Sequence, residues 1–174
     1  DATEAYDVWS ANVKQGSGTA LDIGCSVGRL AFEMSRTHEQ VIGIDTSHAF
    51  IRKARQLLTR KKLDFDLIIE GKITENRHIA FNNGWQYDNI EFLVADAMAL
   101  PFSAAYFSTI ASINILEKVP EPMTHLTEIN RLLKEQDALF VFSDPFSWDA
   151  SVSSPDTWLS GVTKGRFQGR GMDN

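Results

Sequence analysis

The sequence predicts an α/β fold built around a doubly wound, mostly parallel sheet. Short apolar runs, typical of strands that are buried on both faces, recur along the chain. Between them, apolar residues recur at the spacing of amphipathic helices. Because strands that alternate with helices are joined by right-handed crossovers, they form a parallel sheet with helices on both faces.

The expected elements follow one another in a regular order. One helix follows Gly28, and a second begins at Ser47, whose hydroxyl is a good N-cap. In a third helix, His125 lies beside the apolar stripe and is expected at the surface. That stripe consists of Met123, Leu126, Ile129 and Leu133. The five runs expected to form the sheet cover residues 19–23, 41–44, 90–94, 107–113 and 138–143.

A different pattern interrupts this alternation between the second and third strands. Apolar residues at 63, 65, 67 and 69 alternate with Asp64, Asp66 and Ile68, and Glu70 and Gly71 then supply a turn. Period two on either side of a turn is typical of a β-hairpin. We therefore expect a hairpin around 63–80, inserted into the series of helices and strands.

Length and charge narrow the classes of function. The 174 residues fit one domain over 1–174, with a core over 19–145 and a C-terminal loop or tail over 146–174. The net charge of -6 argues against nucleic acid as a partner, because phosphate binding needs a basic surface. No apolar run approaches the ~20 residues that span a bilayer, so no membrane partner is expected.

The reactive residue types point to no metal or thiol chemistry. The single cysteine, Cys25, excludes a disulfide scaffold and fits a reducing interior, so a cytoplasmic location is expected. Cys25 has no evident paired base, and we interpret it as a packed residue rather than a nucleophile. The four histidines share no metal-ligand spacing, so no metal site is expected. The basic residues between Arg52 and Lys62 are interpreted as the solvated face of a helix.

Acidic residues and glycines gather where the predicted strands end. Ligands of open α/β sheets bind at the carboxyl ends of the strands, which here carry Asp22, Asp45 and Asp96. The turn that begins at Asp22 reads D-x-G-x-x-x-G, so it matches neither the dinucleotide fingerprint G-x-G-x-x-G nor a Walker loop. Asp45, at the end of the next strand, is well placed for two ribose hydroxyls. The pattern predicts an adenosine pocket without a pyrophosphate.

This arrangement resembles the class I S-adenosylmethionine-dependent methyltransferases over residues 19–145. The motifs Leu-Asp-Ile-Gly-Cys at 21–25, Val-Ile-Gly-Ile-Asp ending at Asp45, and Asp96-Ala97 before Leu-Pro-Phe occur in the family's order. The segment after the fourth strand, 113–117, matches the one that lines the methionine end of the cofactor. The resemblance implies a Rossmann-like fold, S-adenosylmethionine as cofactor and S-adenosylhomocysteine as product.

The same resemblance implies roles for particular residues. Asp45 would bind the ribose, Asp96 would accept from the adenine amino group, and the backbone of Ala97 would face the ring. The cofactor-binding residues that it implies are Asp22, Gly24, Cys25, Ser26, Gly28, Asp45, Thr46, Asp96, Ala97 and Asn114. No catalytic residue is identified from the sequence.

The sequence also departs from the family pattern at three places. Ser26 replaces the usual middle glycine, so we expect the backbone there to avoid positive φ, which is unfavourable for serine. Lys118 stands where many relatives carry a histidine. The final two strands of the family fold, normally an antiparallel pair, have no counterpart in this sequence.

A narrower resemblance concerns the methyl acceptor. The segments around Asp45 and Phe50, the inserted hairpin, and the run from Ser143 to Trp148 resemble the methyltransferase domain of ovothiol biosynthesis. That kinship implies a small-molecule acceptor such as the imidazole nitrogen or thiol of a thiohistidine. Three aromatic residues are candidates for the wall of an acceptor pocket or for the core: Phe146, Trp148 and Trp158. The alternative function is a non-catalytic module that binds the cofactor or its demethylated product.

Overall fold

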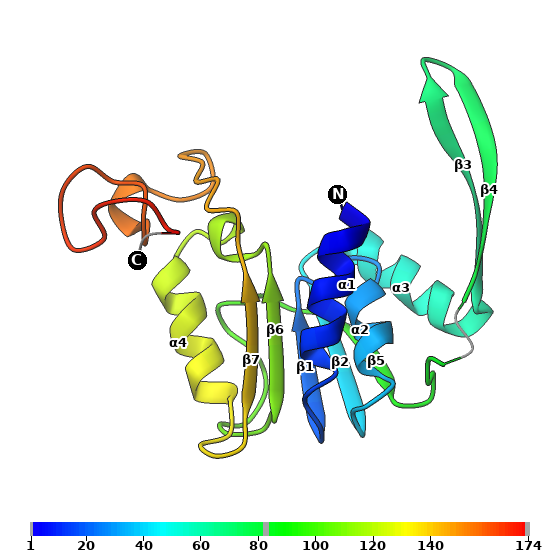
Figure 1. The fold of residues 1–174 in the computed structure, drawn as a ribbon, viewed down its shortest axis with the longest axis horizontal. Helices are drawn as coiled ribbons and strands as arrows, with labels where there is room; N and C mark the ends of the chain where they lie inside the picture. Colours follow the sequence, from blue (N-terminus) through cyan, green and yellow to red (C-terminus); the bar gives the residue numbers. More distant parts are fainter. Residues whose placement is uncertain (1, 82–83, 173–174) are drawn as a thin grey trace.

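A parallel sheet forms the centre of the chain in the computed structural model, which describes residues 2–81 and 84–172 (Figure 1). Its five strands lie in the order β5-β2-β1-β6-β7, and every neighbouring pair is parallel. The strands are β1 (Thr19–Ile23), β2 (Gln40–Asp45), β5 (Ile90–Val94), β6 (Thr109–Ile113) and β7 (Leu139–Ser143). The expected doubly wound α/β fold is confirmed, with each strand within two residues of its predicted start.

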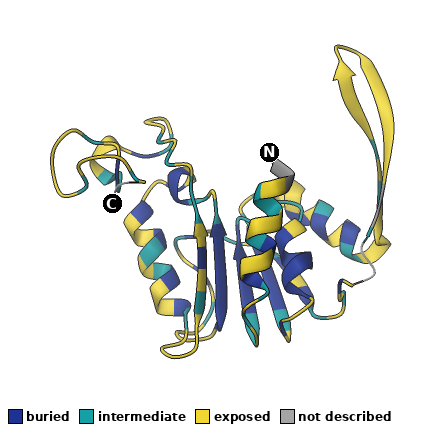
Figure 2. Cartoon of the chain, in the orientation of Figure 1, coloured by how far each residue is buried: buried dark blue, intermediate teal, exposed yellow. Residues whose placement is uncertain are grey.

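Helices cover both faces of the sheet. Successive residues of a strand point to opposite faces, so Ala20 of β1 packs toward one side and Leu21 and Ile23 toward the other. The first face carries α1, α2 and α3, and the second carries α4 and the loop before β6. The helices are α1 (Ala2–Val13), α2 (Arg29–Met34), α3 (His48–Arg60) and α4 (Pro122–Leu132). Figure 2 shows β1, β2 and β6, the three central strands of the five-stranded sheet, as mostly buried.

The apolar stripe predicted for α4 is confirmed at Ile129, which is buried, and at Leu126 and Leu133, which pack against the core, but it was wrong at its first position and for His125. His125 is fully buried, whereas Met123, which was expected in the apolar stripe, is 45% exposed. The buried face repeats at positions 122, 125, 129 and 132, which follows the i, i+3, i+7 spacing better than the stripe chosen from apolar residues alone. A polar side chain in the stripe therefore shifted the sequence-based assignment. At α3 the Ser47 cap is confirmed by a bond of 3.3 Å from the Phe50 N–H to the hydroxyl.

The inserted hairpin is confirmed as β3 (Lys62–Glu70) and β4 (Ile73–Ala80), which pair with each other and form a separate two-stranded sheet. It follows α3 and projects away from the body of the domain (Figure 1). Its surface is almost entirely exposed (Figure 2).

The segment after β7 folds without further sheet. Within residues 84–172 the structure has no strand after β7. Trp148 and Trp158 stack on each other with ring centroids 5.9 Å apart, and their indole N–H groups donate to Ser160 and Ser153. These contacts give the C-terminal segment a small packing centre of its own.

Gly28 offers a direct test of how the turn after β1 packs against Phe92 of β5. Its φ is 91°, and a Cβ added there would lie 2.4 Å from the ring of the buried Phe92. We predict that Gly28→Ala lowers the free energy of unfolding by about 2–4 kcal/mol, from left-handed strain plus overpacking. Gly71→Ala is the matched control, because φ is also positive there but the space around it is open. Equal losses in urea unfolding, instead of about 1 kcal/mol for the control, would contradict the packing argument.

Candidate functional site

Two adjoining hollows lie at the carboxyl ends of the strands and meet at Gly24. The first, of about 390 Å³, lies beside the ends of β2 and β5 and is lined by Asp45, Thr46, Asp96 and Ala97 among others. The second, of about 260 Å³, lies beside α1 and the end of β6 and is lined by Asp22, Cys25, Ser26 and Asn114 together with Tyr6 and Trp9. Gly24 lines both.

The structure therefore brings together the residues that the sequence singled out at the strand ends, except Gly28. Gly28 lines neither hollow. It precedes the first residue of α2, and its N–H donates to the carbonyl of Cys25 at 2.8 Å. Its part in the site is to close the turn after β1.

The turn after β1 corrects the expectation for Ser26. Ser26 has a φ of 52°, in the left-handed region that a non-glycine residue adopts at a cost of about 1–2 kcal/mol. Two bonds oppose this cost. The Ser26 N–H donates to Oδ2 of Asp45 at 3.0 Å, and the Cys25 N–H donates to the Ile44 carbonyl at 2.8 Å. The interactions with the end of β2 thus hold the backbone in a conformation that we expected serine to avoid.

Asp45 joins the turn after β1 to the start of α3. Its Oδ2 accepts from Ser26 in the turn after β1, and its Oδ1 accepts at 2.8 Å from the N–H of Ser47, the residue that caps α3. A carboxylate oxygen can accept two hydrogen bonds. One lone pair on each oxygen is therefore left for a ligand, and the half-buried carboxylate lines the first hollow.

Asp22 is the buried carboxylate of the second hollow. It is 3% exposed, and its Oδ2 has no hydrogen-bond partner among the described residues. Burial raises the pKa of Asp22 to about 7, a backbone hydrogen bond from Ala31 lowers it, and the charge of Asp45 raises it further. An unsatisfied buried carboxylate is unfavourable, so this side of the hollow favours a ligand with a cationic or hydrogen-bond-donating group.

His125 contacts the backbone of Ala97, a residue that lines the first hollow. Its Nδ1 lies 3.1 Å from the Ala97 carbonyl, and its Nε2 lies 2.9 Å from the Ser112 hydroxyl. Burial lowers the pKa of His125, so the ring is neutral, with Nδ1 donating to Ala97 and Nε2 accepting from Ser112. In the turn after β5, the Met98 N–H donates to Oδ1 of Asp96 at 2.9 Å. The sequence analysis missed this role because it placed His125 at the surface.

Helix α1, which the sequence analysis did not predict, supplies Tyr6 and Trp9 to the second hollow. Apolar or aromatic residues at positions 6, 9 and 13 follow helical spacing, so a signal was present. Burial and the charge of Asp22 raise the pKa of the Tyr6 hydroxyl. The guanidinium of Arg29 lies over the Tyr6 ring, 5.8 Å from its centroid.

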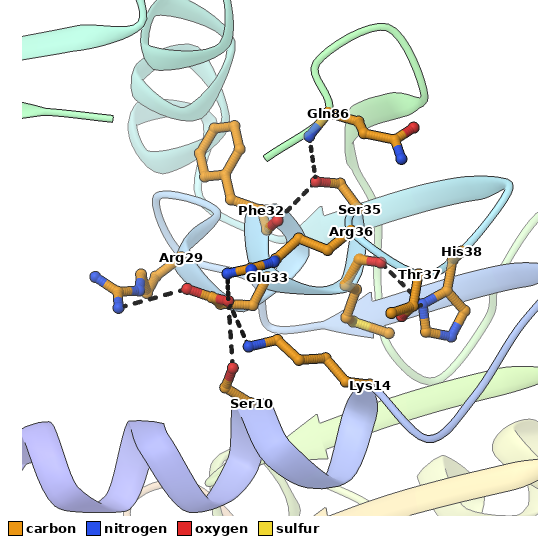
Figure 3. Close-up of polar contacts among 11 residues, drawn as sticks. Ser10, Lys14, Arg29, Phe32, Glu33, Ser35, Arg36, Thr37, His38 and Gln86 are labelled. Atoms are coloured by element: carbon orange, nitrogen blue, oxygen red, sulfur yellow. Dashed lines mark hydrogen bonds and ion pairs between the residues drawn. The ribbon is translucent and has the colours of Figure 1, made fainter. Parts of the chain in front are cut away.

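A charge cluster on α2 holds α1 in place (Figure 3). The Glu33 carboxylate accepts from the Ser10 hydroxyl at 3.3 Å and pairs with Lys14 at 2.9 Å. Arg29 and Arg36 approach the same carboxylate at 3.7 Å. Although burial of Glu33 opposes it, the contacts with Lys14 and Arg29 lower the pKa of that carboxyl. The cluster therefore fixes the helix that carries Tyr6 and Trp9.

Other candidate residues lie apart from the two hollows. Phe146 packs near Phe142, with ring centroids 6.4 Å apart, while Trp148 and Trp158 stack on each other in the C-terminal segment. None of the three candidate acceptor residues lines either hollow. Cys25 is 6% exposed, and burial raises the pKa of its thiol, as expected for a packed residue rather than a nucleophile.

A larger hollow, of about 590 Å³, lies along α3 and includes His48, Arg52, Arg55 and Val94. Arg55 is engaged there with the Phe92 carbonyl of β5, at 2.9 Å from Nε. This hollow contains none of the residues singled out at the strand ends. In the part of the chain that the structure describes, no group of three or more His, Cys, Asp or Glu could hold a metal ion. No described helix is long and apolar enough to cross a bilayer.

Comparison with known proteins identifies the family. Residues 21–141, which contain both hollows except for the contribution of α1, match the family model described as a methyltransferase domain. The chain belongs to this methyltransferase domain family. The matched part of the methyltransferase domain begins in β1 and ends in β7.

In the matched parts, the individual relatives share between 23% and 28% of their residues with this chain. The methyltransferase domain is 28% identical over 137 residues to a demethylmenaquinone methyltransferase of Lactococcus lactis, covering 74% of this chain and 45% of that protein. A SAM-dependent methyltransferase structure from Methanosarcina mazei matches with a TM-score of 0.50 at 25% identity, covering 70% of this chain and 50% of the other. The [4+2]-cyclase SpnF shares the fold, with a TM-score of 0.60 at 23% identity. The match covers 79% of this chain and 43% of SpnF. The chain thus spans half or less of the length of these relatives.

The charge cluster at Glu33 yields a prediction for the methyltransferase domain. We expect Glu33→Gln to lower the free energy of unfolding by about 1–2 kcal/mol and to speed hydrogen exchange of the α1 amides, because charged hydrogen bonds to Ser10 and Lys14 are lost. The pKa of Glu33 is lowered in the folded state, so the difference from wild type is present above pH 4.5 and disappears as the pH falls further.

The exposed Glu39→Gln serves as the control for this change. If Glu33→Gln leaves exchange in α1 unchanged relative to Glu39→Gln, the cluster does not hold the helix.

Proposed function

We propose that this chain is the S-adenosylmethionine-binding catalytic domain of a methyltransferase that acts on a small-molecule acceptor. The observation that carries the proposal is the junction of two hollows at Gly24, one beside Asp45 and the other beside Asp22. Family membership and the name of the Methanosarcina relative support the choice of cofactor. In this proposal the chain forms one domain over 1–174.

The residues of the first hollow suit an adenosine group. Asp45 keeps one lone pair on each carboxylate oxygen for the ribose hydroxyls, as argued above from its bonds to Ser26 and Ser47. Asp96 keeps Oδ2 for the adenine amino group while Oδ1 accepts from Met98. The apolar side chains of Ile44, Met98 and Ile115 line the same hollow and suit the faces of a ring.

The residues of the second hollow suit the amino-acid end of the cofactor. Asp22 would balance its ammonium group, and the turn with Gly24, Cys25 and Ser26 lets backbone groups approach closely. Gly24 is required at the junction, because a Cβ there would lie 2.0 Å from Ile115 Cδ1. Asn114 has a φ of 57°, a conformation that asparagine adopts more readily than most residues, and it closes the hollow beside β6.

The bound cofactor supplies an electrophilic methyl group on a sulfonium. The chain contributes position and a water-poor environment, which favour an in-line displacement when the acceptor is aligned with the methyl–sulfur bond. Tyr6 and Trp9 line the second hollow from α1 and add aromatic surface to it. No described side chain is assigned as a general base, and an acceptor that is already nucleophilic at neutral pH needs none.

Two similarities bear on the class of methyl acceptor. The resemblance to the ovothiol domain favours a thiolated imidazole, whereas the Lactococcus relative is named for a quinone substrate. The acidic chain, with a net charge of -6, disfavours nucleic acid, and its single thiol suits a reducing, cytoplasmic setting. The similarity to SpnF, named as a cyclase, keeps a non-methylating role on the same fold as the second candidate.

Loss of the Asp45 carboxylate should weaken cofactor binding. We predict that Asp45→Ala raises the Kd for S-adenosylhomocysteine, measured by calorimetry, by about 5- to 150-fold, because a charged acceptor for the ribose is removed. Glu135→Ala, which removes an equal charge from an exposed loop, is expected to bind as wild type does. Binding by Asp45→Ala equal to that of the control would remove the ribose assignment.

Binding should also release protons through Asp22. Its pKa of about 7 leaves the carboxyl roughly half protonated at neutral pH, and a bound ammonium would favour the ionised form. We predict release of roughly half a proton per S-adenosylhomocysteine at pH 7, and none for Asp22→Asn. Calorimetry in two buffers of different ionisation enthalpy measures this release, and equal release by both proteins would place the titrating group elsewhere.

A further inference from the structure

The projecting hairpin has an unpaired edge whose sequence is complementary to itself. Among the described residues, β4 pairs only with β3, so the outer edge of β4 is left without a strand. Open edges of this kind recruit another strand, and a two-stranded hairpin is marginally stable by itself. We propose that β4 pairs with β4 of a second copy of this chain, in antiparallel orientation about a two-fold axis at Asn76.

The charges on β4 select this register. With Asn76 opposite Asn76, Glu75 of each copy lies opposite Arg77 of the other. A shift that centres the pair on Glu75 places Glu75 opposite Glu75 of the second chain, and a shift to Arg77 places Arg77 opposite Arg77. Opposite charges across a strand pair are stabilising and like charges are destabilising.

The structure places these two side chains where such pairing needs them. Glu75 and Arg77 lie on the same face of the hairpin, joined by an ion pair of 2.9 Å, and each side chain is about half exposed. Two copies in the proposed register would extend this pair to a four-charge cluster on one face of a four-stranded sheet. The two-fold axis relates identical patches, which is the arrangement of most homodimers.

The outer edge of β3 lacks this property. Its acidic residues are Asp64, Asp66 and Glu70. An antiparallel self-pair centred anywhere from 64 to 68 places an acidic residue opposite another acidic residue. The sequence thus favours pairing through β4 and opposes it through β3.

Apolar side chains near the tip of the hairpin are exposed, which also favours a partner. Ile68 and Ile73 are 68% and 64% exposed, beside the exposed Leu67 and Ile69. In the proposed register the tip of one hairpin lies beside the base of the other, so Ile73 comes next to the second copy. Removing the side chain of Ile73, the one of these four that lies on β4, from water favours association.

Charge exchange tests the register, with sedimentation velocity as the measurement. The wild-type chain is expected to be a dimer, and Glu75→Arg and Arg77→Glu are each expected to be monomers. An equimolar mixture of the two variants restores both opposite-charge pairs and is expected to form a heterodimer. Glu70→Arg, on β3, is the control and should remain a dimer.

Cross-linking tests the position of the axis. Asn76→Cys places two thiols opposite each other at the axis, about 4.5–5.5 Å apart at Cβ, so oxidation is expected to link the dimer. Thr74→Cys places them about 13 Å apart along the strands, and no link is expected. The native Cys25 is buried and does not compete.

Three outcomes would overturn the proposal. They are a wild-type chain that stays monomeric at all concentrations, single variants that dimerise as wild type does, and a mixture that stays monomeric. A monomer that instead sediments with phosphatidylglycerol vesicles would assign the apolar tip to a lipid surface. None of these readouts depends on cofactor binding or on methyl transfer.

Discussion

The carboxylate of Asp45 is the interaction on which the site depends. It accepts from Ser26 in the turn after β1 and from Ser47 at the start of α3, so one side chain fixes the relative positions of two loops that are far apart in the sequence. The left-handed backbone of Ser26 persists because of this bond and of the bond from Cys25 to Ile44. The parallel pairing of β1 with β2 brings the two loops to the same edge.

The two ends of the site differ in what surrounds their carboxylates. Asp45 is half-buried and bonded to two backbone amides, whereas Asp22 is buried with one oxygen unsatisfied and a raised pKa. Such a difference suits a ligand that presents neutral hydroxyls at one end and a cation at the other. The Glu33 cluster contributes to the second end indirectly, because it holds the helix whose Tyr6 and Trp9 line that hollow.

Much of this site could be predicted from the sequence because strand ends are easy to recognise. Apolar runs that end at or near an aspartate predict Asp22, Asp45 and Asp96 at one edge of a parallel sheet from the sequence alone. What failed depended on tertiary contacts. His125 was placed at the surface because a polar residue in an apolar stripe looks solvated, yet Ala97 and Ser112 satisfy both of its ring nitrogens. The hydrogen bonds that stabilise Ser26 likewise come from a distant strand.

The most direct test of one continuous cofactor site is an NMR titration of the chain with S-adenosylhomocysteine, followed through backbone amide chemical shifts. The account predicts that amides of Ser26, Thr46, Met98 and Asn114 shift together and saturate with a single Kd, because they lie around both hollows. Shifts confined to the groove of α3 around Arg52, or to only one of the two hollows, would contradict it.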